Sequence, residues 1–307
     1  MVLREFPDLH WLKKQAEARF AGKKAWNGQT LPQNGWPTVV LNVETKGVFR
    51  DNIRGPLSIF SNLSGESLVT ADRRTIRIRE GFFFVTNHDQ YYTLSVERQP
   101  ALTANIHFSE YLVDEVFQSL SDSPEKLLEN KFFPPLVRRE FYNKLYHKDE
   151  NTSRLIRELC NTSHDELLRQ EKLFELLAHL IREDKQIQRT AAELPVIKNA
   201  TRQELMKRLL CSADYIHDSL NRNLSLEELA HSACLSKFHF LRLFKVTFGK
   251  TPHQFLNHVR VQKGKEMLLH SKTDVRDIAH ELGFAHASAF SRVFFSQVGV
   301  YPSQFRR

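Results

Sequence analysis

Apolar residues alternate with polar or charged ones along several short segments between residues 38 and 108. The clearest segments are 57–61, 75–79 and 102–108, while 82–85 and 91–96 are dense in β-branched and aromatic residues. Glycines at positions 47, 55, 65 and 81 separate these segments at turn-like intervals. Alternation with a period of two is typical of half-buried strands, and short strands at this spacing favour a small antiparallel sandwich or barrel.

From Ser109 onward the period of the apolar residues becomes helical. Between Asp165 and Arg182, four of them fall on one helix face: Leu167, Phe174, Leu177 and Ile181. Such a face must be buried, either by packing on the β-domain or by pairing two subunits, and we predict a homodimer through this helix. A polar stretch that contains Pro195 follows, and it is the best linker candidate. We therefore divide the chain into a first domain (1–182), with strands at about 38–108 and helices at about 109–182, a linker (183–204) and a second domain (205–307).

The second domain contains an internal repeat with an offset of 50 residues. Residues 235–255 align with residues 285–305, and seven positions are identical. The identical pairs are Phe240 and Phe290, Arg242 and Arg292, Phe244 and Phe294, Gly249 and Gly299, Pro252 and Pro302, Gln254 and Gln304, and Phe255 and Phe305. Upstream, residues 226–230 match 275–279 at an offset of 49, so the second copy has one extra residue in its turn.

Each copy has the pattern of a short helix, a turn and a longer helix. Ser225 and Asp274 are suitable N-caps of the short helices, Glu228 completes a capping box with Ser225, and Ser236 can cap a longer helix. The turns contain Cys234 and Gly283, and the longer helices end at Gly249 and Gly299. The sequence therefore predicts two helix-turn-helix motifs.

The two longer helices are amphipathic. Their large apolar residues recur at intervals of four and are expected in the core: Phe240, Phe244 and Phe248, then Phe290, Phe294 and Val298. The opposite faces carry Lys237, Phe238, Leu241, Arg242 and Lys245 in the first copy, and Ala287, Ser288, Ser291, Arg292 and Phe295 in the second. A connecting helix from about Pro252 to Leu269 would place both faces in successive major grooves, about 34 Å apart on one side of the DNA.

Charge is concentrated in the same domain. The 307-residue chain has a net charge of +8, of which residues 201–307 carry +7, with 16 Lys and Arg against 9 Asp and Glu. A basic domain of this size attracts nucleic acid because neutralising phosphates releases counterions, although a solvated basic surface is the simpler alternative.

These motifs resemble the AraC/XylS family of bacterial transcription regulators. The resemblance covers residues 205–307. In the first copy it rests on Ser236, His239, Phe240, Arg242, Phe244, Lys245, Gly249, Thr251 and Pro252, and in the second on Ile278, Ala279, Gly283, Phe284, Ser288, Phe290, Arg292, Phe294, Gly299, Pro302 and Phe305. It implies an α+β two-domain protein, in which a small cupin-like β-sandwich or barrel with flanking helices is followed by an all-α DNA-binding domain. It also implies contact with RNA polymerase and control by an effector or by oligomeric state.

The resemblance places the family's base-reading positions on the exposed faces of both longer helices. They are Phe238, Leu241 and Arg242 in the first helix, and Ala287, Ser288 and Arg292 in the second. Leu241 and Ala287 depart from the family, where polar residues are common, so they read a thymine methyl or no base. Arg242 and Arg292 are the strongest candidates for DNA contact, with a salt bridge as the alternative, and Lys237 and Lys245 are expected at phosphates.

The first domain was also tested for enzyme chemistry. A cupin metal site needs a His-x-His with further ligands, but residues 38–110 contain none, and we expect neither a metal nor a cofactor. Five residues are candidates for a ligand pocket, with core or rim positions as the alternative: Trp36, Arg50, His88, Tyr92 and His107. The cysteines, Cys160, Cys211 and Cys234, lack metal or disulfide spacing and are expected to be reduced and buried.

The sequence lacks an apolar run long enough for a membrane span and does not begin with a secretory pattern, so we expect a cytoplasmic protein. The function predicted is a sequence-specific transcription regulator that binds double-stranded DNA; the resemblance implies activation, while the residues themselves leave activation or repression open. Two alternatives are a cupin-type enzyme tethered to DNA by its basic tail and an effector-free DNA-architectural protein.

Overall fold

The computed structural model describes residues 1–20, 25–26, 29–30, 36–120, 140–161, 165–196 and 198–306. It divides into two compact units, Met1–Ile187 and Gln188–Arg307. Part of the helical region expected at about 109–182 lies outside the described residues.

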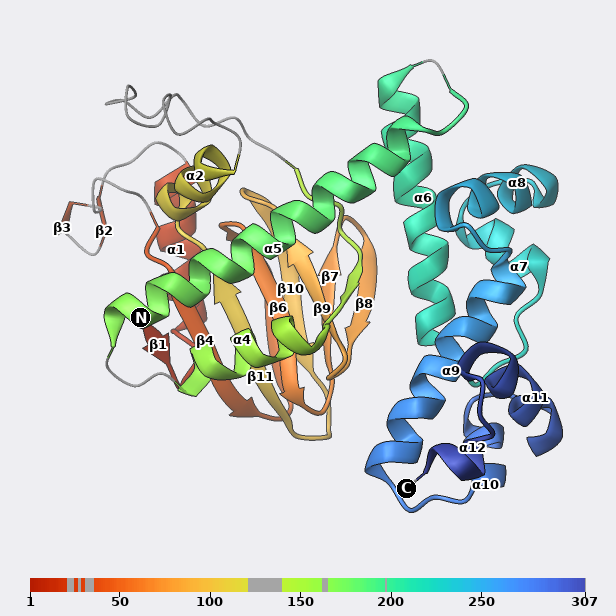
Figure 1. Ribbon diagram of the computed structural model, residues 1–307. Coiled ribbons are helices and arrows are strands. Elements are labelled where there is room, and N and C mark those ends of the chain that lie inside the picture. The colour runs from red at the N-terminus through yellow and green to blue at the C-terminus, as the bar shows by residue number, and fades with distance from the viewer. Residues whose placement is uncertain are drawn as a thin grey trace. The chain divides into compact units, whose positions relative to one another are not determined.

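The first unit is built on two antiparallel sheets that form a sandwich (Figure 1). The six-stranded sheet has the order β1 (Val2–Leu3), β4 (Val39–Thr45), β11 (Ala101–His107), β6 (Ser58–Ser64), β9 (Phe82–Thr86) and β12 (Leu145–His147). The four-stranded sheet has the order β5 (Val48–Gly55), β10 (Gln90–Val96), β7 (Ser67–Ala71) and β8 (Arg74–Ile78). A short hairpin pairs β2 (Ala25–Trp26) with β3 (Gln29–Thr30). Only β1, which is parallel to β4, departs from antiparallel pairing among the described strands.

Alternation along the strands fills two separate cores. Phe60 of β6 is paired with Phe84 of β9 and faces the second sheet, whereas Ile59 is paired with Val85 and faces the opposite way. Both faces of the six-stranded sheet are therefore buried. The sandwich with flanking helices that the sequence predicts is confirmed.

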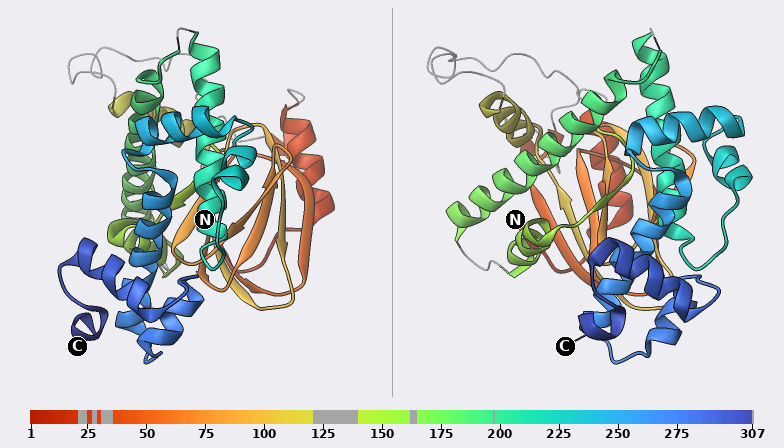
Figure 2. Two further views of the ribbon diagram at one scale, coloured as in Figure 1. Left: turned by 90° about the vertical axis from the view of Figure 1, so that its right-hand side faces the viewer. Right: turned by 45° about the vertical axis from the view of Figure 1, so that its right-hand side comes forward.

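Helices α4 (Glu150–Asn161) and α5 (Glu166–Ala192) cover the outer face of the six-stranded sheet, and α1 (Leu9–Phe20) lies on the opposite side of the sandwich (Figure 2). Helix α2 (Glu110–Ser119) begins at Ser109, whose hydroxyl accepts from the Leu112 amide at 3.2 Å.

The apolar face of α5 packs inside its own unit. Leu177 and Ile181 are buried, Phe174 packs against the same core, and Leu167 is 76% exposed. This face therefore packs on the β-domain, the first of the two fates that the sequence left open, and a homodimer through this helix stays a prediction.

Two short strands lie outside the range expected for strands. β1 precedes it, and β12 lies within the segment expected to be helical; each is held by a neighbouring strand rather than by its own pattern. Residues 183–204, the expected linker, contain the last turns of α5 and the beginning of α6 (Asn199–Asp218).

The second unit consists of helices. After α6 come α7 (Leu226–Ser232), α8 (Lys237–Phe248), α9 (Pro252–His270), α10 (Val275–Glu281), α11 (Ala287–Val298) and α12 (Pro302–Phe305). Helix α9 connects the pair α7 and α8 with the pair α10 and α11 (Figure 1). The repeated phenylalanines at 240, 244, 290 and 294 are fully buried, which confirms the predicted core faces.

Candidate nucleic-acid interface and ligand cavity

The start of each helix-turn-helix is set by local hydrogen bonds. The Ser225 hydroxyl accepts from the Glu228 amide at 3.1 Å, and the Glu228 carboxylate accepts from the Ser225 amide at 2.8 Å, which confirms the capping box. The Asp274 carboxylate accepts from the Arg276 amide at 2.7 Å. Ser236 is the N-cap residue of α8, but its side chain makes no capping hydrogen bond, so the expected cap is wrong in its chemistry.

The turns of the two copies share a left-handed residue. Gly283 has φ of 73°, and Cys234 has φ of 50° at the equivalent place. Cys160 is buried as expected, but Cys234 is exposed and Cys211 is only half-buried, so that part of the expectation is wrong. Cys234 follows the end of α7 in the turn before α8, where its backbone conformation, rather than burial of its thiol, determines its place.

The predicted DNA-contacting residues lie on the faces of α8 and α11 that point away from the core. Lys237, Phe238, Arg242 and Lys245 of α8 are exposed, and Leu241 is half-buried. In α11, Ser288 and Arg292 are exposed, and Ala287 and Ser291 are half-buried. Each of these faces contains an arginine at the same position of the repeat.

The cations on these faces differ in their surroundings. The Lys237 ammonium pairs with the Glu227 carboxylate of α7 at 2.6 Å. Among the described residues, no carboxylate lies within salt-bridge distance of Arg242, Lys245 or Arg292. The guanidinium groups of both repeat-related arginines are thus available to an external partner.

Two exposed aromatic features accompany these cations. Phe238, at the beginning of α8, is 85% exposed, which is unusual for a phenylalanine. Phe295 of α11 is 44% exposed and stacks on Tyr301 with ring centroids 4.6 Å apart.

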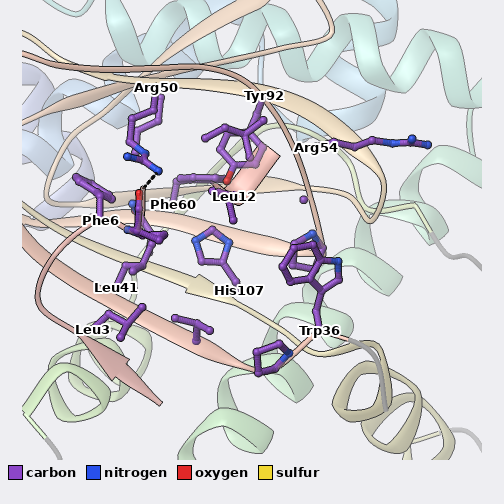
Figure 3. A pocket seen from close by; sticks show the side chains of 18 of the residues that line it. Leu3, Phe6, Leu12, Trp36, Leu41, Arg50, Arg54, Phe60, Tyr92 and His107 are labelled. Atoms are coloured by element: carbon purple, nitrogen blue, oxygen red, sulfur yellow. Dashed lines mark hydrogen bonds between the residues drawn. The ribbon is translucent and has the colours of Figure 1, made fainter. Parts of the chain in front are cut away.

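A separate cavity of about 310 Å³ lies in the first unit, between the two sheets (Figure 3). It brings together Trp36, Arg50, Tyr92 and His107, four of the five residues predicted for a ligand pocket. His88 is not among the residues that line it, and its Nε2 lies 3.7 Å from the Glu110 carboxylate instead. The volume is within the range of small-molecule sites.

Arg50 reaches the cavity from β5. Its Nη2 donates to the Pro7 carbonyl at 2.8 Å, and its guanidinium lies over the Phe6 ring, 5.0 Å from the centroid (Figure 3). Burial lowers the pKa of Arg50, and the nearby Tyr92 and Asp8 offset this in part. The cation is therefore held at an energetic cost inside a largely apolar wall.

His107 lies near the middle of the cavity (Figure 3). The Ser58 hydroxyl donates its single hydrogen to the Pro56 carbonyl at 2.8 Å, and the same oxygen lies 2.8 Å from His107 Nδ1. The Ser58 hydroxyl thus links the His107 imidazole to the backbone at Pro56.

Acidification is expected to destabilise the first unit through His107. Burial, followed by the charge of Arg50, lowers the pKa of His107 from 6.5 to about 4. The unfolded chain therefore binds the proton first, and stability present above pH 6.5 is lost as the pH falls toward 4, by at most about 3 kcal/mol. Thermal unfolding of the wild type and of His107→Gln between pH 7 and pH 4.5 tests this expectation. An equal slope with pH in the two proteins would contradict it.

The structure adds cavity residues that the sequence reasoning missed. Leu3, Phe6 and Trp11 come from the N-terminal segment, and Asn105 comes from β11. A signal for Asn105 was present: alternation that places residues 104 and 106 in the core also places residues 105 and 107 on the opposite face. The N-terminal residues carried no such signal because their contacts are with distant strands.

The described residues contain no group of three or more His, Cys, Asp and Glu side chains that could hold a metal ion. Within the same residues, every helix is too short or too polar to cross a membrane.

Comparison with known proteins gives matches to the second unit. Residues 229–307 match the sequence family described as a helix-turn-helix domain. The MmsAB operon regulatory protein of Pseudomonas aeruginosa is 33% identical over 93 residues, 30% of this chain and 30% of that protein. The lactose operon transcription activator of Staphylococcus xylosus is 25% identical over 95 residues, 31% of this chain and 34% of that protein. The chain spans about a third of the length of these curated relatives.

A solved structure is similar over the same region. The DNA-binding domain of AdpA, in complex with a target DNA, is 28% identical and covers 32% of this chain and 89% of that chain, with a TM-score of 0.32. The duplicated motif, its capped short helices and its buried phenylalanines agree with the sequence matches. The second unit therefore contains a helix-turn-helix domain that is similar in sequence to those of bacterial transcription regulators.

Proposed function

We propose that the protein is a sequence-specific DNA-binding transcription regulator in which both helix-turn-helix motifs contact one duplex. The observation that supports this proposal is the repeat of one surface: α8 and α11 each bury two phenylalanines and expose an arginine without a carboxylate partner among the described residues. An arginine fork of this kind forms bidentate hydrogen bonds with guanine or with a phosphate.

Roles are assigned by position on the two helices. Arg242 and Arg292 read base edges, with Phe238, Leu241, Ala287, Ser288 and Ser291 next to them in the grooves. Lys245 contacts a phosphate. Lys237 can contact a phosphate only after its ion pair with Glu227 is broken. The loss of this ion pair reduces the binding free energy that the phosphate contact contributes.

Substitution of the two arginines tests this proposal. Arg292→Ala and Arg242→Ala are each expected to weaken binding to the preferred site by about 1 to 3 kcal/mol and to relax base preference at one position. Lys245→Ala is expected to weaken binding on all sequences alike and to reduce the salt dependence. Fluorescence anisotropy with a site selected from random duplex DNA, and with single-base variants of it, measures both effects.

The matched control is Arg154→Ala, which removes one positive charge from the first unit, where Arg154 pairs with Glu158. Its affinity for DNA should stay within twofold of the wild type. Equal losses for Arg292→Ala on every sequence would reassign that residue to a phosphate, and no loss for either arginine variant would refute the assignment of the two faces.

The finer part of the proposal is effector control and activation. The cavity in the first unit supports an effector site because it combines apolar walls with a few polar groups, as ligand pockets do. Its proposed ligand contacts are Trp36, Arg50, Tyr92 and His107. His88 is left out because it does not line the cavity. Contact with RNA polymerase is proposed from the family alone. A reporter gene placed beside the selected site distinguishes activation from repression.

A further inference from the structure

The charges that surround the cavity are of one sign. Of the described residues that line it, Arg50, Arg54 and the N-terminal ammonium of Met1 are cationic, and none is Asp or Glu. Arg54 is neutralised by Asp89, and the Met1 ammonium donates to the Thr38 carbonyl at 3.1 Å. The remaining wall is apolar and contains aromatic rings at positions 6, 11, 36, 60 and 92.

Among the described residues, neither Arg50 nor the Met1 ammonium makes an ion pair, and Arg50 is the side-chain cation of this cavity without one. One of its donors is used by the Pro7 carbonyl. Asp8 is near enough to influence Arg50, but its carboxylate accepts from the Trp11 amide at 2.7 Å and serves as a cap of α1. A guanidinium has five N–H donors, so Arg50 has donors left for a ligand.

The side-chain amide of Asn105 is a second hydrogen-bond donor in the cavity wall. The side chain of Asn105 is 1% exposed, and its Oδ1 lies 3.4 Å from the Ser61 amide that donates to it. Its Nδ2 has no hydrogen-bond partner among the described residues. A buried amide nitrogen without a partner costs about 1 to 3 kcal/mol, so a ligand acceptor that reaches it would recover that free energy.

We propose that the cavity binds a small apolar monocarboxylate, with its carboxylate at Arg50 and its hydrocarbon or aromatic body between the two sheets. Asn105 donates a further hydrogen bond from β11, and the His107 imidazole in the cavity wall is placed to hydrogen-bond a hydroxyl or amide on the ligand body. The inference rests on the proposed effector site and names the chemical class of its ligand.

Other ligand classes fit the same walls less well. A cationic ligand would meet Arg50 and the N-terminal ammonium without a carboxylate to offset them. A sugar would lose hydrogen bonds to water along most of its surface, because the walls offer few polar groups. A carboxylate attached to an apolar body matches both the Arg50 cation, which has no ion pair, and the apolar surface.

Three probes that share one body test the proposal. We would titrate the full-length protein with 4-phenylbutanoate, 4-phenylbutanamide and 4-phenylbutylamine by calorimetry. Tryptophan fluorescence gives a second readout, because Trp11 and Trp36 line the cavity. The carboxylate is expected to bind at least tenfold more tightly than the amide, and the amine is expected to bind least.

Two variants and a matched control locate the carboxylate. Arg50→Met should lower the affinity for 4-phenylbutanoate at least tenfold and leave that for the amide within threefold. Lys13→Met removes a cation that pairs with Asp51 outside the cavity lining and should change neither affinity by more than threefold. Because Arg50 also holds the Pro7 carbonyl, the unfolding temperature of each variant without ligand is measured as well. Asn105→Ala, which leaves Arg50 in place, should lower the affinity for the carboxylate at least threefold.

Equal affinities for the acid and the amide would overturn the proposal, as would an unchanged acid affinity in Arg50→Met, or no binding of any probe at millimolar concentration. These outcomes are separate from the proposed regulator function, because DNA binding by the same preparation is measured without a probe. Loss of selective DNA binding together with selective binding of the acid would refute the regulator and retain the ligand class.

Discussion

Gly283→Ala is expected to destabilise the second helix-turn-helix by about 3 kcal/mol. Gly283 has φ of 73°, and a Cβ atom there would lie 2.8 Å from the Leu220 carbonyl oxygen, 2.8 Å from the Asn221 carbonyl carbon and 2.6 Å from Arg260 Nη2. The left-handed conformation costs a non-glycine residue about 1 to 2 kcal/mol, and the clash with backbone adds about 1 to 3 kcal/mol.

Hydrogen exchange of the amides in α9 to α11 measures this loss in the full-length protein. Since a factor of ten corresponds to about 1.4 kcal/mol, the protected amides should exchange about 100-fold faster than in the wild type. Gly299→Ala is the matched control: its φ is 83°, but no atom lies within 4 Å of its added Cβ. It should cost only about 1 kcal/mol. Equal acceleration by the two variants would show that Gly283 is required for its backbone conformation alone.

Arg260→Met is expected to destabilise the second unit by a similar free energy and to release the two helix-turn-helix motifs from their fixed relative placement. Arg260 is 6% exposed on α9, where its Nε donates to the Leu220 carbonyl at 2.9 Å and its Nη2 to the Arg222 carbonyl at 2.7 Å. Its guanidinium also lies 5.1 Å from the centroid of the Phe284 ring. Each carbonyl left without a donor costs about 1 to 3 kcal/mol, so the second unit should lose about 3 kcal/mol of stability.

The consequence for DNA binding follows from the elements that Arg260 joins. It connects α9 with the loop before α7 and with the turn before α11, so it holds the two halves of the repeat in one arrangement. Arg260→Met should lower the affinity for a site with both half-elements more than tenfold and change the affinity for a single half-element by less than threefold. Anisotropy titrations with both duplexes measure the two effects.

Lys263→Met is the control for this experiment, because Lys263 lies on the same helix, is exposed and pairs only at the surface with Glu266, at 2.9 Å. It should leave both affinities within threefold of the wild type. If Arg260→Met weakened the single half-element as much as the complete site, Arg260 would act through the stability of the fold and not through the relative placement of the two motifs.

The helical unit was largely predictable because its signals are local. Capping by Ser225 and Asp274, left-handed glycines at helix ends and phenylalanines four residues apart depend on contacts within about two turns of helix. Ser236 shows the limit: its position at the N-terminus of α8 followed from the repeat, but the absence of a capping hydrogen bond from its side chain did not. Cys234 is exposed in the turn between α7 and α8, which its residue type does not reveal.

The first unit was predictable in its architecture but not in its details. Alternation identified the strands between residues 38 and 108, because one or both faces of each are buried. Strands β1 and β12 are two and three residues long, and only pairing with distant strands makes them strands. The apolar face of α5 was predicted, but the surface that covers it was not. The sequence pattern indicates that this face is buried and does not identify the element against which it packs.

The sequence alone determined the repeat, the longer helix of each helix-turn-helix motif and the residues that these helices expose, because periodicity and capping are encoded within each copy. The tertiary structure decided three further points: that the α5 face is buried in its own unit, that Arg260 joins the two motifs, and that Arg50, Asn105 and His107 share one cavity. These depend on contacts between residues far apart in the chain, which no local pattern specifies.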